Sequence, residues 1–295
     1  MSGVKEALRK IYGDKVEIAD IKPVSGGAIN ESFCLCLDNE EKVFLKTNDV
    51  DKYAMFETEE FSLACLRKTE AIRIPEVYRT GIDEEQGFSY ILMEYLDNKE
   101  PEEDDYRRLG KKLAEMHMKD ASSFVEKGKY GFKQDNYIGS IAQKNSEYDS
   151  WIEFYRDCRM IPQFKMAEAY FDEEDHRRIG IFLASLDELL IEPDFPSLLH
   201  GDLWQGNCLI TTDGQPCLID PATYVGHNET DLAMMQLYGG FPSVLFEEYA
   251  KILPIKEGYY PVRRDIYQLY HIVNHLNIFG RRFLEDARRI IYRYS

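Results

Sequence analysis

The residues best suited to chemistry lie between positions 198 and 222. Two leucines lead into His200-Gly201-Asp202, Asn207 follows five residues after Asp202, and Asp220 comes later in the same region. Amide and carboxylate oxygens suit a hard divalent cation such as Mg²⁺, which takes few protein ligands and keeps its other positions for water and phosphate oxygens. Asp202 could then orient a hydroxyl group and accept its proton.

Short elements must position these groups. The apolar runs 208–210 and 216–219 flank Asp213-Gly214, a dipeptide typical of hairpin turns. The predicted hairpin has Asn207 at its start and Asp220 at its end. An Asp, then an Asn five residues later, then an Asp at a strand end is the order found in the catalytic loops of protein-kinase-like phosphotransferases.

Two neighbouring residues have simpler interpretations. His200 is expected to be a hydrogen-bonded structural residue rather than a base. Asp231 falls in the first turn of a predicted helix, where its charge would favour the helix dipole, and a direct catalytic role stays open as the alternative.

Composition restricts the possible partners. The chain has 295 residues, 44% of them hydrophobic, which is enough for one globular protein of two lobes or domains. Its net charge of -17 should repel nucleic acids and anionic membranes, so neither is an expected partner. Any phosphate must therefore be bound by a local group of donors.

The cysteines and the apolar runs suggest a compartment. The six cysteines contain no C-x-x-C pair and mostly lie in apolar runs, which indicates reduced core thiols. No signal-like apolar block opens the sequence, and no run approaches the 18 apolar residues of a membrane span. We expect a soluble, cytoplasmic protein.

The region before residue 97 is rich in predicted strands. These strands cover residues 16–24, 32–37, 42–46 and 89–93, and helical spacing covers 4–11 and 55–66. Gly26-Gly27 lies between two strands, where it is either an ordinary hairpin or a loop whose N–H groups approach a phosphate. Lys46 ends an apolar run as either a solvated strand end or a cation for nucleotide phosphates, and Glu57, Glu59 or Glu60 could hold it.

Beyond residue 97 the pattern is mainly helical. Residues 94–96 are either a simple strand end or a hinge whose backbone receives adenine. Helices are predicted over 104–117, 151–170, 172–190 and 261–294, and Asn228 or Thr230 could cap a helix that runs to residue 237. His117 is expected to be a capping or packed residue, and the aromatic, Gly-rich loop 129–140 either binds substrate or covers a core edge.

The sequence resembles the fructosamine kinase family, in the aminoglycoside-phosphotransferase-like branch of the protein-kinase-like fold. The H-G-D-L-W-x-G-N form at residues 200–207 is far more specific than H-G-D alone, and the resemblance covers essentially the whole chain. Further matching segments are residues 26–30, 44–46, 55–59, 93–94, 110–117, 131–139, 220–222, 226–229, 239–242 and 267–270.

The resemblance implies an α+β, two-lobe fold. Residues 1–96 would form a small nucleotide-binding lobe with an antiparallel sheet plus helix, and residues 97–295 a larger, mostly helical lobe for catalysis and substrate. The implied roles are Asp202 as catalytic base, Asn207 and Asp220 as Mg²⁺ ligands, Lys46 with Glu59 on the ATP phosphates, Gly26, Gly27 and Ala28 as phosphate loop, Glu94, Tyr95 and Leu96 as adenine hinge, and Trp204 and His227 as substrate contacts.

The implied reaction is ATP-dependent phosphorylation of a sugar hydroxyl, at O3 of a fructosamine or ribulosamine on a small molecule or a protein, as a step of deglycation repair. One alternative is a kinase of the same fold with an aminoglycoside or choline as acceptor. Another is an inactive nucleotide-binding protein, which the presence of Lys46, Asp202, Asn207 and Asp220 disfavours. The sugar, its carrier amine and the oligomeric state are not determined by the sequence.

Overall fold

The computed structural model describes residues 1–24 and 29–295, and they form two compact units. The first consists of Met1–Asp105 with Cys208–Asp220, and the second of Tyr106–Asn207 with Pro221–Ser295. By their packing, residues 97–105 and the 208–220 hairpin therefore belong with the N-terminal sheet. A functional boundary between residues 96 and 97 stays a prediction.

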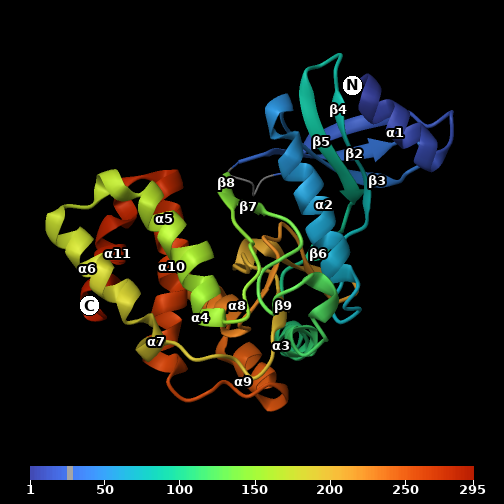
Figure 1. The fold of residues 1–295 in the computed structure, drawn as a ribbon. Coiled ribbons are helices and arrows are strands. Elements are labelled where there is room, and N and C mark those ends of the chain that lie inside the picture. Colours follow the sequence, from blue (N-terminus) through green and yellow to red (C-terminus); the bar gives the residue numbers. More distant parts are fainter. Residues whose placement is uncertain (25–28) are drawn as a thin grey trace. The chain divides into compact units, whose positions relative to one another are not determined.

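The first unit is built on a five-stranded antiparallel sheet in the order β1-β2-β3-β5-β4 (Figure 1). Four of its strands fall where the sequence predicts them, and β3 is longer than expected because it continues past Lys46. The strands are β1 (Ile18–Pro23), β2 (Glu31–Leu37), β3 (Lys42–Asp49), β4 (Val77–Asp83) and β5 (Phe88–Glu94).

Two helices pack against this sheet, α1 (Ser2–Tyr12) and α2 (Tyr53–Arg67). The core beneath α1 includes Val43 and Leu45 of β3. Side chains alternate between the two faces of a strand. Lys46 must therefore point to the face opposite the α1 core, and its contact with Glu59 shows that α2 lies on that side.

The predicted hairpin is present and joins the first unit through a strand that the sequence did not reveal. β10 (Cys208–Thr211) pairs with β11 (Pro216–Leu218), and Gly214 at the turn has φ 77°. β10 also pairs with β6 (Asn98–Lys99).

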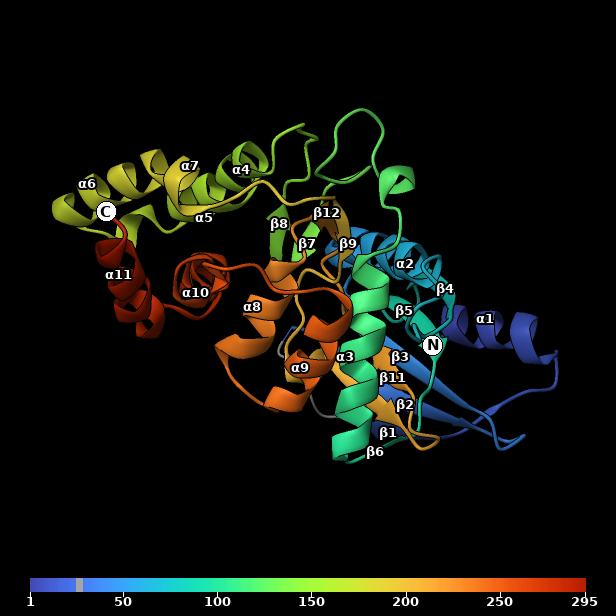
Figure 2. The same cartoon turned by 90° about the horizontal axis from the view of Figure 1, so that it is seen from below.

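The second unit is mainly helical, and its helix α10 contacts α5, α8 and α11 (Figure 2). Its small strands form two pairs, β7 with β8 and β9 with β12. The elements are α3 (Glu103–His117, which begins in the first unit), β7 (Asn136–Ile138), β8 (Ile141–Gln143), α4 (Trp151–Phe154), α5 (Ile161–Met166), α6 (Glu173–Ala184), α7 (Leu186–Leu189), β9 (Ser197–Leu199), β12 (Tyr224–Gly226), α8 (Glu229–Leu237), α9 (Ser243–Ile252), α10 (Arg264–Phe279) and α11 (Leu284–Arg293).

Three helix predictions in this unit need correction. The helix expected over residues 172–190 is divided at Ser185 into α6 and α7. The helix expected over residues 151–170 is interrupted, because Tyr155–Met160 form a π-helical turn between α4 and α5. Neither proposed residue caps α8 with its side chain. Asn228 instead donates to the Tyr249 hydroxyl, and Thr230 donates to the His227 carbonyl.

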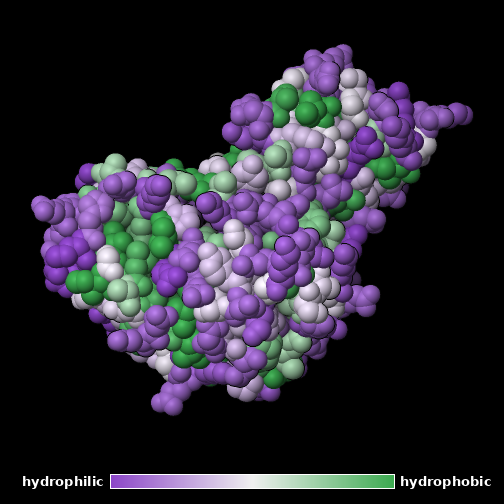
Figure 3. Space-filling view, in the orientation of Figure 1, coloured by the Kyte–Doolittle hydropathy of each residue, from purple (hydrophilic) through white to green (hydrophobic). Residues whose placement is uncertain are grey.

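The face shown in Figure 3 is dominated by hydrophilic side chains, which agrees with a sequence in which 30% of the residues are charged. All six cysteines are free, as expected. None of the helices in the described part of the chain has the length and apolar character that a membrane crossing requires.

A matched pair of glycine substitutions tests the packing of the second unit. Gly110 lies in α3, where an added Cβ would sit 2.2 Å from the Leu245 carbonyl oxygen, whereas Gly180 in α6 has no other atom within 4 Å of that position. We expect Gly110→Ala to lower the free energy of unfolding in urea by about 1–3 kcal/mol. Gly180→Ala should leave it unchanged or raise it by up to about 1 kcal/mol. Equal effects of the two changes would contradict this packing.

Candidate functional site

A buried ionic cluster connects the sheet, α2 and the hairpin of the first unit. The Lys46 ammonium group donates to Glu59 at 2.7 Å and also to the Asp220 carboxylate. The Lys46 residue is only 4% exposed, so it is not the solvated strand end that was considered as an alternative. The structure thus brings together three of the residues singled out in the sequence and selects Glu59 among the three candidate glutamates.

The charges of this cluster shift its acid–base equilibria. Burial alone would lower the pKa of Lys46, but the neighbouring carboxylates of Asp220 and Glu59 raise it overall, so the ammonium group stays charged. Burial, reinforced by Asp220 and opposed by Lys46, raises the pKa of Glu59 to about 7. A permanently charged ammonium group is what negative phosphate oxygens require of a partner.

Asp220 holds an unusual backbone conformation at the end of the hairpin. Its φ of 55° lies in the left-handed region, which Asp and Asn tolerate better than other side chains. The hairpin is fixed just before this point because Leu218 donates its N–H to the Arg73 carbonyl at 3.0 Å. This anchoring fixes the backbone from which the Asp220 carboxylate projects.

The predicted hinge lies at the end of β5. Its first residue is hydrogen-bonded to the segment that precedes β4. The Glu94 carboxylate accepts a hydrogen bond from Arg73 at 2.6 Å, and the backbone N–H of Glu94 donates to the Glu76 carbonyl at 2.7 Å. Because that N–H is engaged, the peptide groups of Tyr95 and Leu96 are the better candidates for bonding adenine.

In the second unit, residues 200–207 form a tight loop around Asp202. Gly201 has φ 83°, and a Cβ there would sit 2.1 Å from the Ala222 carbonyl oxygen, so only glycine fits. The Asn207 amide nitrogen donates to the Asp202 carbonyl at 2.9 Å. This bond fixes the orientation of the Asn207 amide group, and its oxygen is the atom that a magnesium ion would use.

The carboxylate of Asp231 is hydrogen-bonded to the backbone of this loop. It accepts hydrogen bonds from the backbone N–H groups of His200 at 2.8 Å and Gly201 at 2.9 Å, and from the His117 ring at 3.1 Å. His117 in turn bonds the Tyr249 hydroxyl at 2.8 Å. Burial would raise the pKa of Asp231, but its hydrogen bonds and the neighbouring histidines lower it overall.

These contacts settle the local roles of three residues. His117 and His200 are fully buried and hydrogen-bonded, as expected of structural histidines. Asp231 holds the loop backbone, a role that the sequence did not reveal. Only its spacing after the His-Gly-Asp segment could have suggested it.

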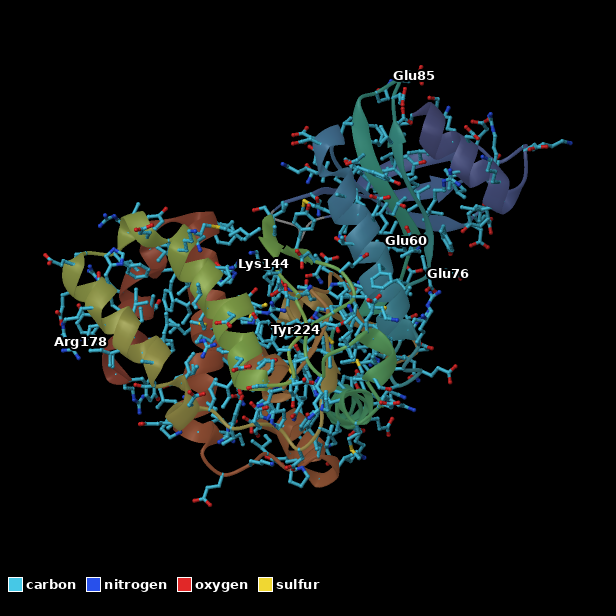
Figure 4. The ribbon with its side chains drawn as sticks, viewed as in Figure 1. Glu60, Glu76, Glu85, Lys144, Arg178 and Tyr224 are labelled. Atoms are coloured by element: carbon cyan, nitrogen blue, oxygen red, sulfur yellow. The ribbon has the colours of Figure 1, made fainter. Side chains whose placement is uncertain are left out.

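A second set of buried contacts, which the sequence did not predict, surrounds Arg159. This fully buried guanidinium group lies 3.9 Å from the centre of the Tyr224 ring and donates to the Lys144 carbonyl at 2.6 Å. Figure 4 labels these two partners, Tyr224 and Lys144. Arg159 also donates to Asn145 at 2.7 Å. Among the described residues, no carboxylate forms an ion pair with Arg159.

Polar side chains next to Arg159 hold the backbone just after Asp220. Gln143 donates to the Ala222 carbonyl at 3.1 Å, and Asn136 donates to the Thr223 carbonyl at 2.8 Å. Tyr130 and Phe132 of the Gly-rich loop are buried. These contacts favour the interpretation of this loop as a cover for the core edge.

The two residues predicted to contact the substrate differ in solvent accessibility. Trp204 is 38% exposed, and its indole lies so close to Gly206 that a Cβ there would come within 2.2 Å of the ring. His227 is 2% exposed and bonds the Tyr267 hydroxyl at 2.8 Å, and its pKa falls to about 3 through burial and the charge of Arg263. Its burial favours a packing role over contact with a substrate.

The phosphate-loop prediction on Gly26, Gly27 and Ala28 lies outside the described residues. Within the described residues, no group of three or more His, Cys, Asp or Glu side chains is placed to hold a metal ion. Magnesium does not require such a group, because it binds one or two carboxylates and completes its shell with water and phosphate. The oxygens of Asn207 and Asp220 fit that ion in chemical type.

Known proteins resemble this chain over its whole length. A probable ketoamine kinase of Synechocystis sp. is 35% identical over 295 residues, covering 98% of this chain and 94% of the relative. The chloroplastic protein-ribulosamine 3-kinase of Arabidopsis thaliana is 38% identical over 287 residues, covering 96% and 84%.

Solved structures agree with the sequence relatives. The crystal structure of a candidate fructosamine-3-kinase from Haemophilus somnus matches with a TM-score of 0.84 and 28% identity, covering 99% of this chain and 96% of that one. A macrolide 2'-phosphotransferase from Brachybacterium faecium matches with a TM-score of 0.61 and 15% identity over 99% and 98%, a likeness in fold. These neighbours confirm the kinase-like α+β fold predicted from the sequence.

The family model for fructosamine kinases matches residues 1–295. The chain belongs to the fructosamine kinase family.

Proposed function

We propose that this protein is an ATP-dependent ketoamine kinase that phosphorylates O3 of a fructosamine or ribulosamine. The observation that carries the proposal is the supported Asp202 loop, in a chain whose relatives over nearly the full length are named ketoamine and ribulosamine kinases. Phosphoryl transfer needs mainly positioned charges and an oriented hydroxyl group, which a rigid loop of this type can supply.

Five of the predicted site residues have a defined task in this proposal. Asp202 orients the acceptor hydroxyl and takes its proton as the oxygen attacks the γ-phosphate. Lys46, held by Glu59, binds nucleotide phosphates, and Asn207 and Asp220 supply oxygen ligands to Mg²⁺. When bound, the ion would neutralise charge on the phosphate oxygens.

The cellular role follows from the acceptor. A phosphorylated ketoamine is unstable and breaks down, so the reaction would serve deglycation of small amines or proteins in the cytoplasm. Kinases of choline or aminoglycosides are not favoured as models. The choline kinase of Streptococcus pneumoniae matches at only 14% identity, against 35–38% for the ketoamine and ribulosamine kinases.

The central test is a coupled assay of ADP release with ribulose-lysine and fructose-lysine, using choline and an aminoglycoside as comparison acceptors. We expect turnover with at least one ketoamine. Turnover confined to choline or the aminoglycoside would overturn the proposal.

Removing the proposed base should stop chemistry and leave nucleotide binding intact. We expect Asp202→Asn to lower kcat by about 10²- to 10⁴-fold because a positioned proton acceptor is lost. The melting temperature and the Kd for ATP should change little. Asp149→Asn, the same change at an exposed position of the second unit, is the matched control. An Asp202→Asn enzyme with more than about a tenth of normal kcat would remove Asp202 from this role.

Activity should also depend on a divalent cation. Excess EDTA should abolish turnover and added Mg²⁺ should restore it, because few protein groups neutralise the phosphate charge. Asn207→Ala removes one oxygen ligand, so its half-maximal activity should require more Mg²⁺ than the normal enzyme. Full activity in excess chelator would show that the metal assignment is wrong.

A further inference from the structure

An exposed row of aromatic rings runs across the second unit from the end of α8 to the end of α10. We call Tyr238, His275, Phe279 and Phe283 the aromatic row. Ring centres are 5.4 Å apart between Tyr238 and His275 and 5.5 Å apart between His275 and Phe279. Tyr238 is 51% exposed and Phe279 40% exposed, whereas His275 and Phe283 are half-buried between them. A row of contacting aromatic rings that is exposed at two points is typical of a binding surface.

The row begins next to the loop that carries Asp202. Two residues after Tyr238, Gly240 packs so closely on Gln205 that an added Cβ would lie 2.2 Å from the Gln205 amide oxygen. Trp204, the other exposed ring of this region, directly precedes Gln205. Tyr238 is also within electrostatic reach of Asp202, since partial burial and that carboxylate raise the pKa of the Tyr238 phenol.

The two ends of the row differ in charge. At Tyr238 the negative charges of Asp202 and Asp286 outweigh the positive charge of Arg282. At the other end, the Arg282 guanidinium lies 5.3 Å from the Phe279 ring centre and 4.9 Å from that of Phe283. Between them the His275 ring is hydrogen-bonded to the Tyr238 hydroxyl. Burial and the charge of Arg282 lower the pKa of His275 to about 4, which keeps that ring uncharged at neutral pH.

This polarity matches one kind of acceptor. We propose that the aromatic row binds the carrier side of a glycated lysine, with the cationic secondary amine at Tyr238 and the aliphatic stem along His275 and Phe279. The carbonyl or carboxylate at the lysine Cα then points toward Arg282. The inference rests on the proposed function and extends it from the sugar to its carrier.

The physical reasons are those of aromatic recognition sites. A tyrosine face attracts an ammonium group, and nearby carboxylates strengthen that attraction. Apolar rings remove an aliphatic stem from water. Tyr238 is therefore an amine-binding residue and Phe279 a specificity residue, both distinct from Asp202, which acts on the sugar hydroxyl.

The test compares two acceptors that share a sugar and a cationic amine. Ribulose attached to lysine Nε has the stem, and ribulose attached to methylamine lacks it. We expect Tyr238→Leu, which keeps apolar volume but removes the ring, to lower kcat/KM for both acceptors by about 3- to 30-fold. Tyr238→Phe, which keeps the ring, should stay within about threefold of the normal enzyme.

Phe279→Ala should lower kcat/KM for the lysine adduct and leave the methylamine adduct unchanged. Phe195→Ala, which removes a ring exposed to a similar degree (36%) elsewhere in the second unit, is the matched control and should change neither. The KM for ATP and the melting temperature should be unchanged in all variants. If these rings served only to pack the second unit, their removal would instead lower the melting temperature and leave the preference between the two acceptors unchanged.

The possible failures are distinguishable. If the normal enzyme phosphorylates neither adduct, the proposed function is wrong. If it phosphorylates them but Tyr238→Leu and Phe279→Ala keep kcat/KM and the preference for the lysine adduct within about twofold, the aromatic row does not bind the carrier.

Discussion

The second unit depends most on one buried carboxylate, that of Asp231. A buried anion is costly unless donors surround it, and here two backbone N–H groups and the His117 ring do so. The same contacts fix the backbone at His200 and Gly201, from which Asp202 projects. The loop geometry and the stability of α8 therefore rest on the same hydrogen bonds, so the loop cannot shift without exposing an unpaired charge.

The first unit uses a different solution, an ammonium group shared by two carboxylates. Lys46 is carried by the sheet, Glu59 by α2 and Asp220 by the hairpin, so each charge comes from a different element. One ammonium and two carboxylate groups compensate one another, which makes the burial of Lys46 and Glu59 tolerable, while the Asp220 side chain stays 38% exposed. In both units, the hydrogen bonds that compensate for burying a charge, at Asp231 and at Lys46, also fix the positions of groups proposed to act in phosphoryl transfer.

Local signals predicted much of this architecture. Asp213-Gly214 between two apolar runs predicts the hairpin, and in the structure Gly214 takes the left-handed conformation of the turn, which glycine adopts without strain. The pairing of Lys46 with Glu59 was also accessible, through the resemblance. The contact of Asp231 with His117 was not, because these residues lie 114 positions apart and no local pattern encodes such a pair. The break at Tyr155–Met160 did leave a signal, which the helix prediction over residues 151–170 overlooked. Pro162 lacks a backbone N–H and its ring crowds the carbonyl four residues earlier, within the π-helical turn.

The hairpin has a consequence for biosynthesis. The first unit is discontinuous in sequence, because β10 completes a sheet with β6 while the residues between them build most of another unit. Domains usually fold in the order in which a ribosome delivers them. Here the N-terminal sheet can form early, but its hairpin arrives only after residues 106–207 have been synthesised. The first unit can therefore be completed only after most of residues 106–207 have been synthesised, and before residues 221–295 of the second unit are available.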